Sequence, residues 1–117
     1  INQFELHPLC IPTETVEYCK DNNIQIEAYS SLGRHDPKLV ENAVVVSTAQ
    51  KYGKSVSQLL LRWSLDQGYV VLPKSRSKER IVENFAISDF KLEDQDITAL
   101  NDLNQNMHTC WDPTNIA

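Results

Sequence analysis

Four basic residues, Lys74, Arg76, Lys78 and Arg80, lie within seven positions directly after an apolar run. The chain has 11 lysines and arginines in all, so this segment holds more than a third of its positive charge. We expect the apolar run to form a buried strand and the basic residues to span the start of the next helix. Ligands bind at the carboxyl ends of strands in parallel α/β folds, and backbone N–H groups at a helix N-terminus attract anions. The cluster predicts a phosphate site, and the alternative is a solvated basic helix start.

Aromatic and polar side chains mark two further predicted strands. Tyr29 ends one of them, where its ring is placed to stack on a planar heterocycle; the alternative is a core tyrosine with a satisfied hydroxyl. Gln3 and Glu5 alternate with Phe4 on an earlier strand. Inward polar groups on a buried strand need hydrogen-bonding partners. A neighbouring side chain is the commoner partner for such a group, and a ligand amide is the alternative.

Several common site motifs are absent from the sequence. Glycine occurs only at positions 33, 53 and 68, so neither the dinucleotide motif GxGxxG nor a P-loop can be written. A nucleotide that binds here must be held without either loop. The histidines are scattered, without metal-ligand spacing, and we expect no metal site. The three cysteines cannot all pair in one chain, and we expect reduced, buried thiols. The histidines are His7, His35 and His108, and the cysteines are Cys10, Cys19 and Cys110.

Charge and composition limit the partners. The chain has 16 acidic and 11 basic residues, and its net charge of -5 argues against general affinity for nucleic acid or anionic lipid. No apolar run approaches the roughly 20 residues that cross a bilayer. We expect a cytoplasmic protein with a small-molecule partner and no nucleic-acid or membrane partner. The chain begins at Ile1 without methionine or a signal-like segment, so we expect Ile1 to be an internal position of something longer.

Hydrophobic patterns predict three strands, at residues 1–6, 24–29 and 69–72, the last buried on both faces. The clearest helix start is the capping box of Ser55 and Gln58, which predicts a helix ending near Gly68. An earlier helix is expected to begin after an N-cap at Thr13. Its partial apolar stripe is predicted to consist of Val16, Tyr18 and Cys19.

Three more helices complete the predicted order. One is expected between Leu39 and Gly53, one opens at Ser77, and a last one carries Ile97, Leu100 and Leu103. The order is strand, helix, strand, two helices, strand, helix, helix. Strands that alternate with helices predict a parallel sheet, and nothing in the sequence divides residues 1–117 into two domains. Three parallel strands cannot by themselves close a barrel.

Six short motifs occur in the same order as in the carboxyl-terminal part of the aldo-keto reductases, which the chain resembles from Ile1 to about Asn106. They are NQFELHP at residues 2–8, AYSSLG at 28–33, KYGK at 51–54, LRW at 61–63, LPKS at 72–75 and ERIVENF at 79–85. The resemblance implies an α/β fold, a parallel (β/α) barrel of the TIM type, of which this chain is the C-terminal portion. It also implies NADPH as cofactor, bound without a glycine-rich loop.

The resemblance implies roles for residues at the nicotinamide end of the cofactor. Gln3 resembles the residue that hydrogen-bonds the nicotinamide carboxamide, and Tyr29 resembles the aromatic residue that stacks on the ring. Ser30 and Leu32 resemble loop positions that touch the pyrophosphate. Trp111, in the C-terminal tail, is a candidate lining residue of a substrate pocket.

The resemblance also gives the basic cluster a specific role. Lys74, Ser75 and Arg80 resemble the group that holds the adenosine 2′-phosphate, while Glu83 and Asn84 match positions near the adenine. Cations that converge on this phosphate favour NADPH over NADH, because NADH lacks the group.

The family's proton-donating tyrosine and its lysine, aspartate and histidine partners come from earlier strands, so we expect no catalytic residue in this chain. The implied function is NADPH-dependent reduction of aldehydes and ketones to alcohols, with residues 1–117 as the C-terminal part of a single NADP(H)-dependent oxidoreductase domain that needs the N-terminal half of its barrel. One alternative is an inactive nucleotide-binding or regulatory subunit on the same scaffold. Another is an inactive truncated fragment, for which we expect exposed apolar surface and self-association, because three strands leave two open edges.

Overall fold

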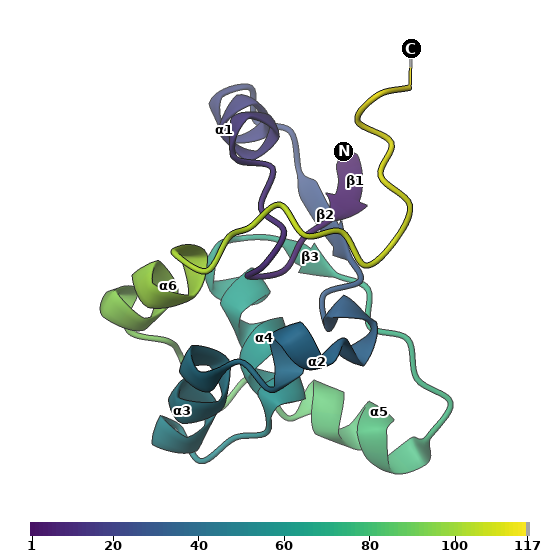
Figure 1. The fold of residues 1–117 in the computed structure, drawn as a ribbon. Coiled ribbons are helices and arrows are strands. Elements are labelled where there is room, and N and C mark those ends of the chain that lie inside the picture. Colours follow the sequence, from purple (N-terminus) through teal and green to yellow (C-terminus); the bar gives the residue numbers. More distant parts are fainter. Residues whose placement is uncertain (117) are drawn as a thin grey trace.

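A computed structural model describes residues 1–116 and shows a parallel sheet of three strands in the order β1-β2-β3 (Figure 1). The strands are β1 (Asn2–Glu5), β2 (Ile26–Tyr29) and the two-residue β3 (Val70–Val71). In the register of the sheet, Glu5 lies opposite Tyr29, and Ala28 lies opposite Val71. The carboxyl ends of all three strands therefore meet at one edge of the sheet, as the alternating pattern predicted.

Helices fill the connections between the strands and follow the last one. One helix joins β1 to β2, a 3-10 turn and three helices join β2 to β3, and two helices follow β3. Their bounds are α1 Thr13–Asp21, η1 Gly33–His35, α2 Pro37–Val40, α3 Ala43–Lys51, α4 Val56–Asp66, α5 Lys78–Phe85 and α6 Asp94–Asn101. Within residues 1–116, none of these helices has both the length and the apolar character that a bilayer crossing requires.

Helix α4 forms as its sequence predicts. The Ser55 hydroxyl accepts a hydrogen bond from the Gln58 N–H, and the Gln58 side chain accepts one from the Ser55 N–H, which completes the capping box. The helix buries one face and ends at Asp66, before Gly68. Its Trp63 is 1% exposed and donates a hydrogen bond of 2.9 Å to Asn101, which fixes α6 against the core. Trp63 is therefore a core residue that anchors α4.

The predicted single helix between Leu39 and Gly53 is wrong, because the chain forms α2 and α3 with a break between them. Asn42 causes the break. Its side-chain oxygen accepts hydrogen bonds from Val44 N–H and Val45 N–H, so it begins a new helix. A side-chain acceptor of this kind satisfies backbone donors that a continuous helix would otherwise bond internally. The apolar residues keep their helical spacing across this break, so the spacing alone did not indicate it.

Two details of α1 also differ from prediction. Pro12, not Thr13, is the N-cap residue, and no side chain caps this helix. The Thr13 hydroxyl instead donates to the carbonyl of Ile11 at 3.4 Å. Val16 and Cys19 are buried as expected, but Tyr18 is 63% exposed and does not belong to the buried stripe.

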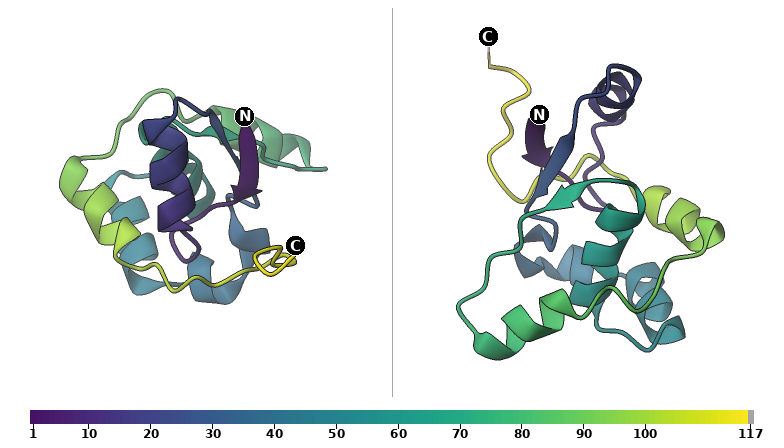
Figure 2. Two further views of the ribbon diagram at one scale, coloured as in Figure 1. Left: turned by 90° about the horizontal axis from the view of Figure 1, so that it is seen from above. Right: turned by 180° about the vertical axis from the view of Figure 1, so that it is seen from behind.

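The prediction that residues 69–72 are covered on both faces is wrong for this chain. Val70 is 40% exposed and Leu72 is 45% exposed. The reason is that β3 forms the edge of the sheet, as Figure 2 shows from behind, and the chain leaves it through a long loop to α5. Phe85 on α5 is 80% exposed. The expected exposed apolar surface is therefore present at β3 and α5.

Candidate functional site

A pocket of about 510 Å³ lies between the β3–α5 loop, the start of α5 and the loop after β2. It brings together six of the residues predicted to bind the cofactor: Leu32, Lys74, Ser75, Arg80, Glu83 and Asn84. Three further residues line it: His35, Ser57 and Arg76. Arg76 belongs to the basic cluster, whereas the sequence predicts no role for His35 or Ser57. His35 lies two positions beyond the Ser-Ser-Leu-Gly loop, and that proximity was the only available signal.

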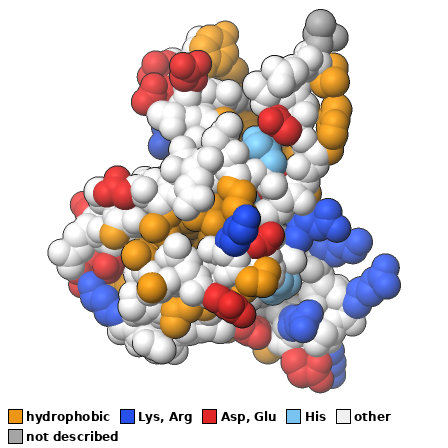
Figure 3. Space-filling model, in the orientation of Figure 1, with side chains coloured by type: hydrophobic (Ala, Val, Ile, Leu, Met, Phe, Trp, Pro, Cys, Tyr) orange, Lys and Arg blue, Asp and Glu red, His pale blue; other side chains and the backbone are white. Residues whose placement is uncertain are grey.

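The cations of this pocket form no ion pair within the described part of the chain. Among residues 1–116, the lysines and arginines that form ion pairs are Lys51, Lys54 and Arg62. The side chains of Lys74, Arg76 and Arg80 are exposed and form none. Figure 3 shows Lys and Arg side chains gathered on this side of the molecule. Unpaired cations around one hollow favour the binding of an anion there.

Helix α5 is held in place by the capping box of α4. The Ser55 hydroxyl also donates to the Glu83 carboxylate. The Gln58 amide donates to the Glu83 carbonyl at 3.2 Å and to the Ala86 carbonyl at 3.3 Å. At the start of α5, the Ser77 hydroxyl accepts from the Arg80 N–H, which confirms the predicted opening of this helix. The same few side chains thus start α4 and fix the helix that carries Arg80.

A second pocket, of about 350 Å³, continues the first along the loop after β2. The two pockets share Leu32, His35 and Lys74, so they form one groove. Ser30 lines the second pocket, as expected for a residue of this loop. The wall opposite Lys74 is built by a left-handed turn in which Gly33, Arg34 and His35 all have positive φ, at 54°, 54° and 59°. Left-handed backbone in non-glycine residues is strained and is concentrated at functional sites.

Gln3 and Tyr29 line a third pocket, of about 370 Å³, which extends along the whole of β1 and reaches Tyr29 at the end of β2. Tyr29 is half-buried, and burial raises the pKa of its hydroxyl. The C-terminal tail supplies part of the opposite wall through His108, Pro113 and Thr114. Trp111 lines none of the three pockets and is 70% exposed, so its assignment to a substrate pocket stays a prediction.

Glu5 also lines this pocket; it is 2% exposed and has neighbouring protein groups as its partners. Its carboxylate accepts from Thr109 N–H at 2.7 Å and Cys110 N–H at 3.1 Å, and His7 Nε2 lies 3.0 Å away. Burial raises the pKa of Glu5, but the hydrogen bonds from Thr109, His7 and Cys110 outweigh burial and leave the pKa below its usual value. The sequence left two possible partners for an inward polar group, a neighbouring protein group and a ligand amide. Glu5 is hydrogen-bonded by protein side chains and backbone.

Ligand atoms of Glu5, Cys10 and His108 lie within 4.8 Å of one another, a grouping that spacing along the sequence had not indicated. The Glu5 oxygens that face this group already accept hydrogen bonds from the tail. Burial raises the pKa of the Cys10 thiol to about 12, so the thiol stays protonated at neutral pH. Metal binding requires thiolate and free carboxylate lone pairs. In the structure these three side chains form a hydrogen-bonded cluster that joins β1 to the tail.

The described residues place the predicted cysteines as follows. Cys10 and Cys19 are buried, which confirms their interpretation as small core residues. Cys110 is half-buried in the tail, with its Sγ 3.0 Å from the Ser30 hydroxyl, so for this residue the interpretation is wrong in part. The tail brings Cys110 to the rim of the groove, where solvent reaches it.

A sequence model described as "Aldo/keto reductase family" matches residues 1–105. The chain belongs to the aldo/keto reductase family. One similar protein is the uncharacterized oxidoreductase YtbE of Bacillus subtilis, 40% identical over 98% of this chain. Another is a glyoxal reductase of the same organism, 42% identical over 90% of this chain. This chain spans 40% of the length of the first relative and 37% of the second.

Solved structures of aldo/keto reductases share the fold. MGS-M4, an aldo-keto reductase enzyme from a deep-sea metagenome library, superposes with a TM-score of 0.91 at 36% identity over 99% of this chain. An aldo/keto reductase from Brucella melitensis gives a TM-score of 0.82 at 41% identity over 88% of this chain. This chain corresponds to 43% and 38% of those two chains. The predicted fold class, part of a parallel (β/α) barrel of the TIM type, is confirmed.

Proposed function

We propose that this aldo/keto reductase chain supplies the NADPH-binding portion of an enzyme that reduces aldehydes and ketones to alcohols. The observation that carries the proposal is the groove itself. Three exposed cations without ion-pair partners line one end of it, and an amide and a tyrosine line the pocket beside β1. A dinucleotide phosphate has the matching chemistry, with phosphates at one end and a planar carboxamide at the other.

At the phosphate end, Lys74, Ser75 and Arg80 hold the 2′-phosphate of the adenosine. Lys74 and Arg80 are exposed and form no ion pair within residues 1–116, which leaves their donors free for such a group. Glu83 and Asn84 lie on the same wall, next to the adenine. Charge-assisted hydrogen bonds are the strong ones, so this end favours NADPH over NADH.

The middle of the groove carries the pyrophosphate. Ser30 and Leu32 line it on the side of β2, and Lys74 lines it on the side of β3. The left-handed turn at Arg34 and His35 adds two further cationic or protonatable side chains to the same wall. Basic side chains therefore line both pockets of the groove, with Glu83 as an acidic residue on its wall.

At the ring end, Gln3 hydrogen-bonds the nicotinamide carboxamide and Tyr29 stacks on the ring. Both side chains line one pocket, and Tyr29 comes from the last residue of β2. When bound, the cofactor supplies the hydride that reduces the carbonyl carbon. The side chains of this chain bind and orient that ring, and the proton donor belongs to a part of the barrel outside residues 1–117. The bound carbonyl compound is a small molecule, as the names glyoxal reductase and aldehyde reductase indicate for two relatives.

The cellular setting that we propose is the cytoplasm. The described residues contain three free thiols, and free thiols are typical of reducing compartments.

Titration with NADPH and with NADH, followed through tryptophan and tyrosine fluorescence, tests the cofactor assignment. The protein should bind NADPH more tightly than NADH. Equal affinity for the two would count against the roles of Lys74 and Arg80. A second assay, NADPH oxidation with an aldehyde and the full-length protein, separates a reductase from a regulatory subunit. A protein that binds NADPH selectively but oxidises none with a panel of aldehydes and ketones is the nucleotide-binding alternative.

A further inference from the structure

Glu5 is a buried carboxylate that has no role in the proposed binding of the cofactor. It is the last residue of β1, and its oxygens accept hydrogen bonds from three donors of the C-terminal tail: the N–H and hydroxyl of Thr109 and the N–H of Cys110. The Nε2 atom of His7 lies 3.0 Å from a carboxylate oxygen of Glu5. Burying an ionised carboxylate is costly unless it is well hydrogen-bonded, and these donors meet that need.

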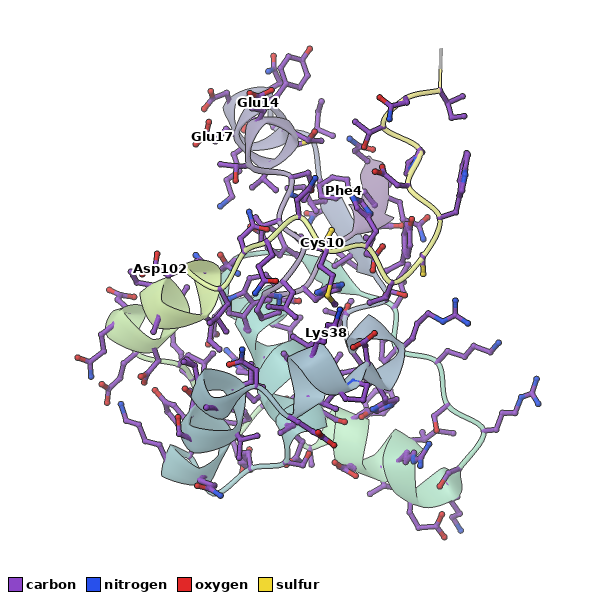
Figure 4. The ribbon with its side chains drawn as sticks, in the orientation of Figure 1. Phe4, Cys10, Glu14, Glu17, Lys38 and Asp102 are labelled. Carbon is purple, nitrogen blue, oxygen red and sulfur yellow. The ribbon has the colours of Figure 1, made fainter. Side chains whose placement is uncertain are left out.

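The tail reaches Glu5 along a fixed path and continues beyond it without buried contacts. Before this point, the Met107 N–H donates to the Leu9 carbonyl at 2.8 Å. After it, residues 111–116 are exposed. Glu5 is therefore the last buried anchor of the tail within the described residues. Figure 4 shows the tail running past Cys10 and Phe4 at the carboxyl end of the sheet.

The position of the tail sets one wall of the pocket that contains Gln3 and Tyr29. His108, just before the anchored residues, lines this pocket, and so do Pro113 and Thr114 just after them. Cys110 is itself held 3.0 Å from the Ser30 hydroxyl, at the end of β2. If the tail leaves Glu5, the pocket of Gln3 and Tyr29 (the ring pocket) loses this wall. The pocket of Lys74 and Arg80 (the phosphate pocket) keeps its shape, because none of the described residues that line it belongs to the tail.

We infer that Glu5 is a positioning residue. Its ionised carboxylate holds residues 108–110 against the ends of β1 and β2, and this contact places the tail as a wall of the ring pocket. The inference rests on the proposed function in one respect, that the pocket receives the nicotinamide ring. It adds that tight binding of the ring end depends on a buried carboxylate that holds the tail in place at the pocket.

The variant Glu5→Gln tests the inference, because it keeps the volume of the side chain and removes the charge. Glu27→Gln, on the neighbouring strand β2, is the matched control. Hydrogen exchange reports on the anchor directly. In Glu5→Gln, protection of the Thr109 and Cys110 amides should fall by about tenfold or more, as expected for loss of a charged acceptor, while the amides of α4 keep theirs.

Two probes separate positioning from general stability. In the proposed binding mode NADPH occupies both the groove and the pocket of Gln3 and Tyr29, while 2′,5′-ADP occupies only the phosphate end of the groove. Glu5→Gln should weaken NADPH several-fold and leave 2′,5′-ADP unchanged, and Glu27→Gln should change neither. Unchanged protection of Thr109 and Cys110, or equal weakening of both ligands, would overturn the inference.

A second variant keeps the test decisive if Glu5→Gln does not fold. Thr109→Val removes one tail donor and leaves the core intact, so it should shift NADPH affinity in the same direction by less. A folded Thr109→Val protein with unchanged amide protection and unchanged NADPH affinity would also overturn the inference. If the unmodified protein binds neither NADPH nor 2′,5′-ADP, the proposed function fails, and the exchange measurement still decides whether Glu5 anchors the tail.

Discussion

Glu5 and Thr109 lie 104 positions apart in the sequence, yet the carboxylate of Glu5 accepts hydrogen bonds from both the backbone N–H and the hydroxyl of Thr109. This contact joins the first strand to the end of the chain. It lies at the carboxyl edge of the sheet (Figure 1), and Glu5 itself is one of the residues that line the pocket of Gln3 and Tyr29. Stability and the shape of the site are therefore linked at one buried carboxylate.

The buried pair of Glu5 and His7 predicts a loss of stability in acid. Burial lowers the pKa of His7 from 6.5, so the unfolded chain binds more protons below that pH and the free energy of unfolding falls as pH falls. The lowered pKa of Glu5 contributes stability above 4.5 that is lost as pH falls through its folded value. Urea unfolding from neutral pH downward should show both phases. His7→Asn should remove the dependence between 6.5 and 4.5; a flat profile there in the unmodified protein would contradict the prediction.

Gly33 is predicted to tolerate no side chain. Its φ is +54°, and a Cβ would lie 2.5 Å from Leu39 Cδ2, so Gly33→Ala combines backbone strain with a steric clash. The free energy of unfolding should fall by about 2–4 kcal/mol. Gly53→Ala is the control, because its φ is +63° but nothing lies within 4 Å of the added Cβ. It should cost only the strain of the left-handed backbone, roughly 1–2 kcal/mol. Equal losses in the two variants, measured by denaturant unfolding, would exclude the clash.

Ser55 is predicted to affect both stability and cofactor binding. Ser55→Ala removes the cap of α4, which costs about 1 kcal/mol, and also the hydrogen bond to Glu83 on α5. The start of α5 carries Arg80, so NADPH affinity should fall as well. Ser47→Ala is the control, because that hydroxyl donates only to the Val44 carbonyl within α3. Normal NADPH affinity in a destabilised Ser55→Ala protein would show that the contact with Glu83 does not position the site.

The exposed apolar edge predicts self-association of this chain. Val70, Leu72 and Phe85 are 40%, 45% and 80% exposed, and β3 presents unpaired backbone groups beside them. Sedimentation at micromolar concentration should show dimers or larger species, and Phe85→Glu should shift the distribution toward monomer. A monomeric chain that unfolds cooperatively would contradict this prediction.

Local signals along the sequence were sufficient for most of the elements. The capping box of Ser55 and Gln58 placed the start of α4, and the Ser77 cap placed the start of α5. The basic residues after β3 gather in one pocket because parallel strands end at a common edge, a rule that needs no knowledge of side-chain contacts.

Long-range contacts were not accessible in the same way. The partners of Glu5 lie at the other end of the chain, in a segment without a helical or strand pattern, so no local signal indicated them. The burial of residues 69–72 was overestimated for a related reason. An apolar run indicates that a strand is suited to burial, but it does not show which segment buries the strand. Val70 lies at an edge of the sheet that this chain does not cover. Asn42 shows a third limit of prediction from hydrophobic spacing. The spacing predicts one continuous helix, but the side-chain oxygen of Asn42 caps a new helix and so divides the segment into two.

Calorimetric titration of the unmodified protein and of Arg80→Ala, each with NADPH and with NADH, tests the proposed cofactor site most directly. The unmodified protein should prefer NADPH. Arg80→Ala should weaken NADPH by roughly 1–3 kcal/mol, as does loss of a hydrogen bond to a charged group, and should leave NADH nearly unchanged. Lys91→Ala, an exposed cation that lines none of the three pockets, should change neither affinity. Equal affinity for the two nucleotides, or equal weakening of both in Arg80→Ala, would contradict the assignment of this groove to NADPH.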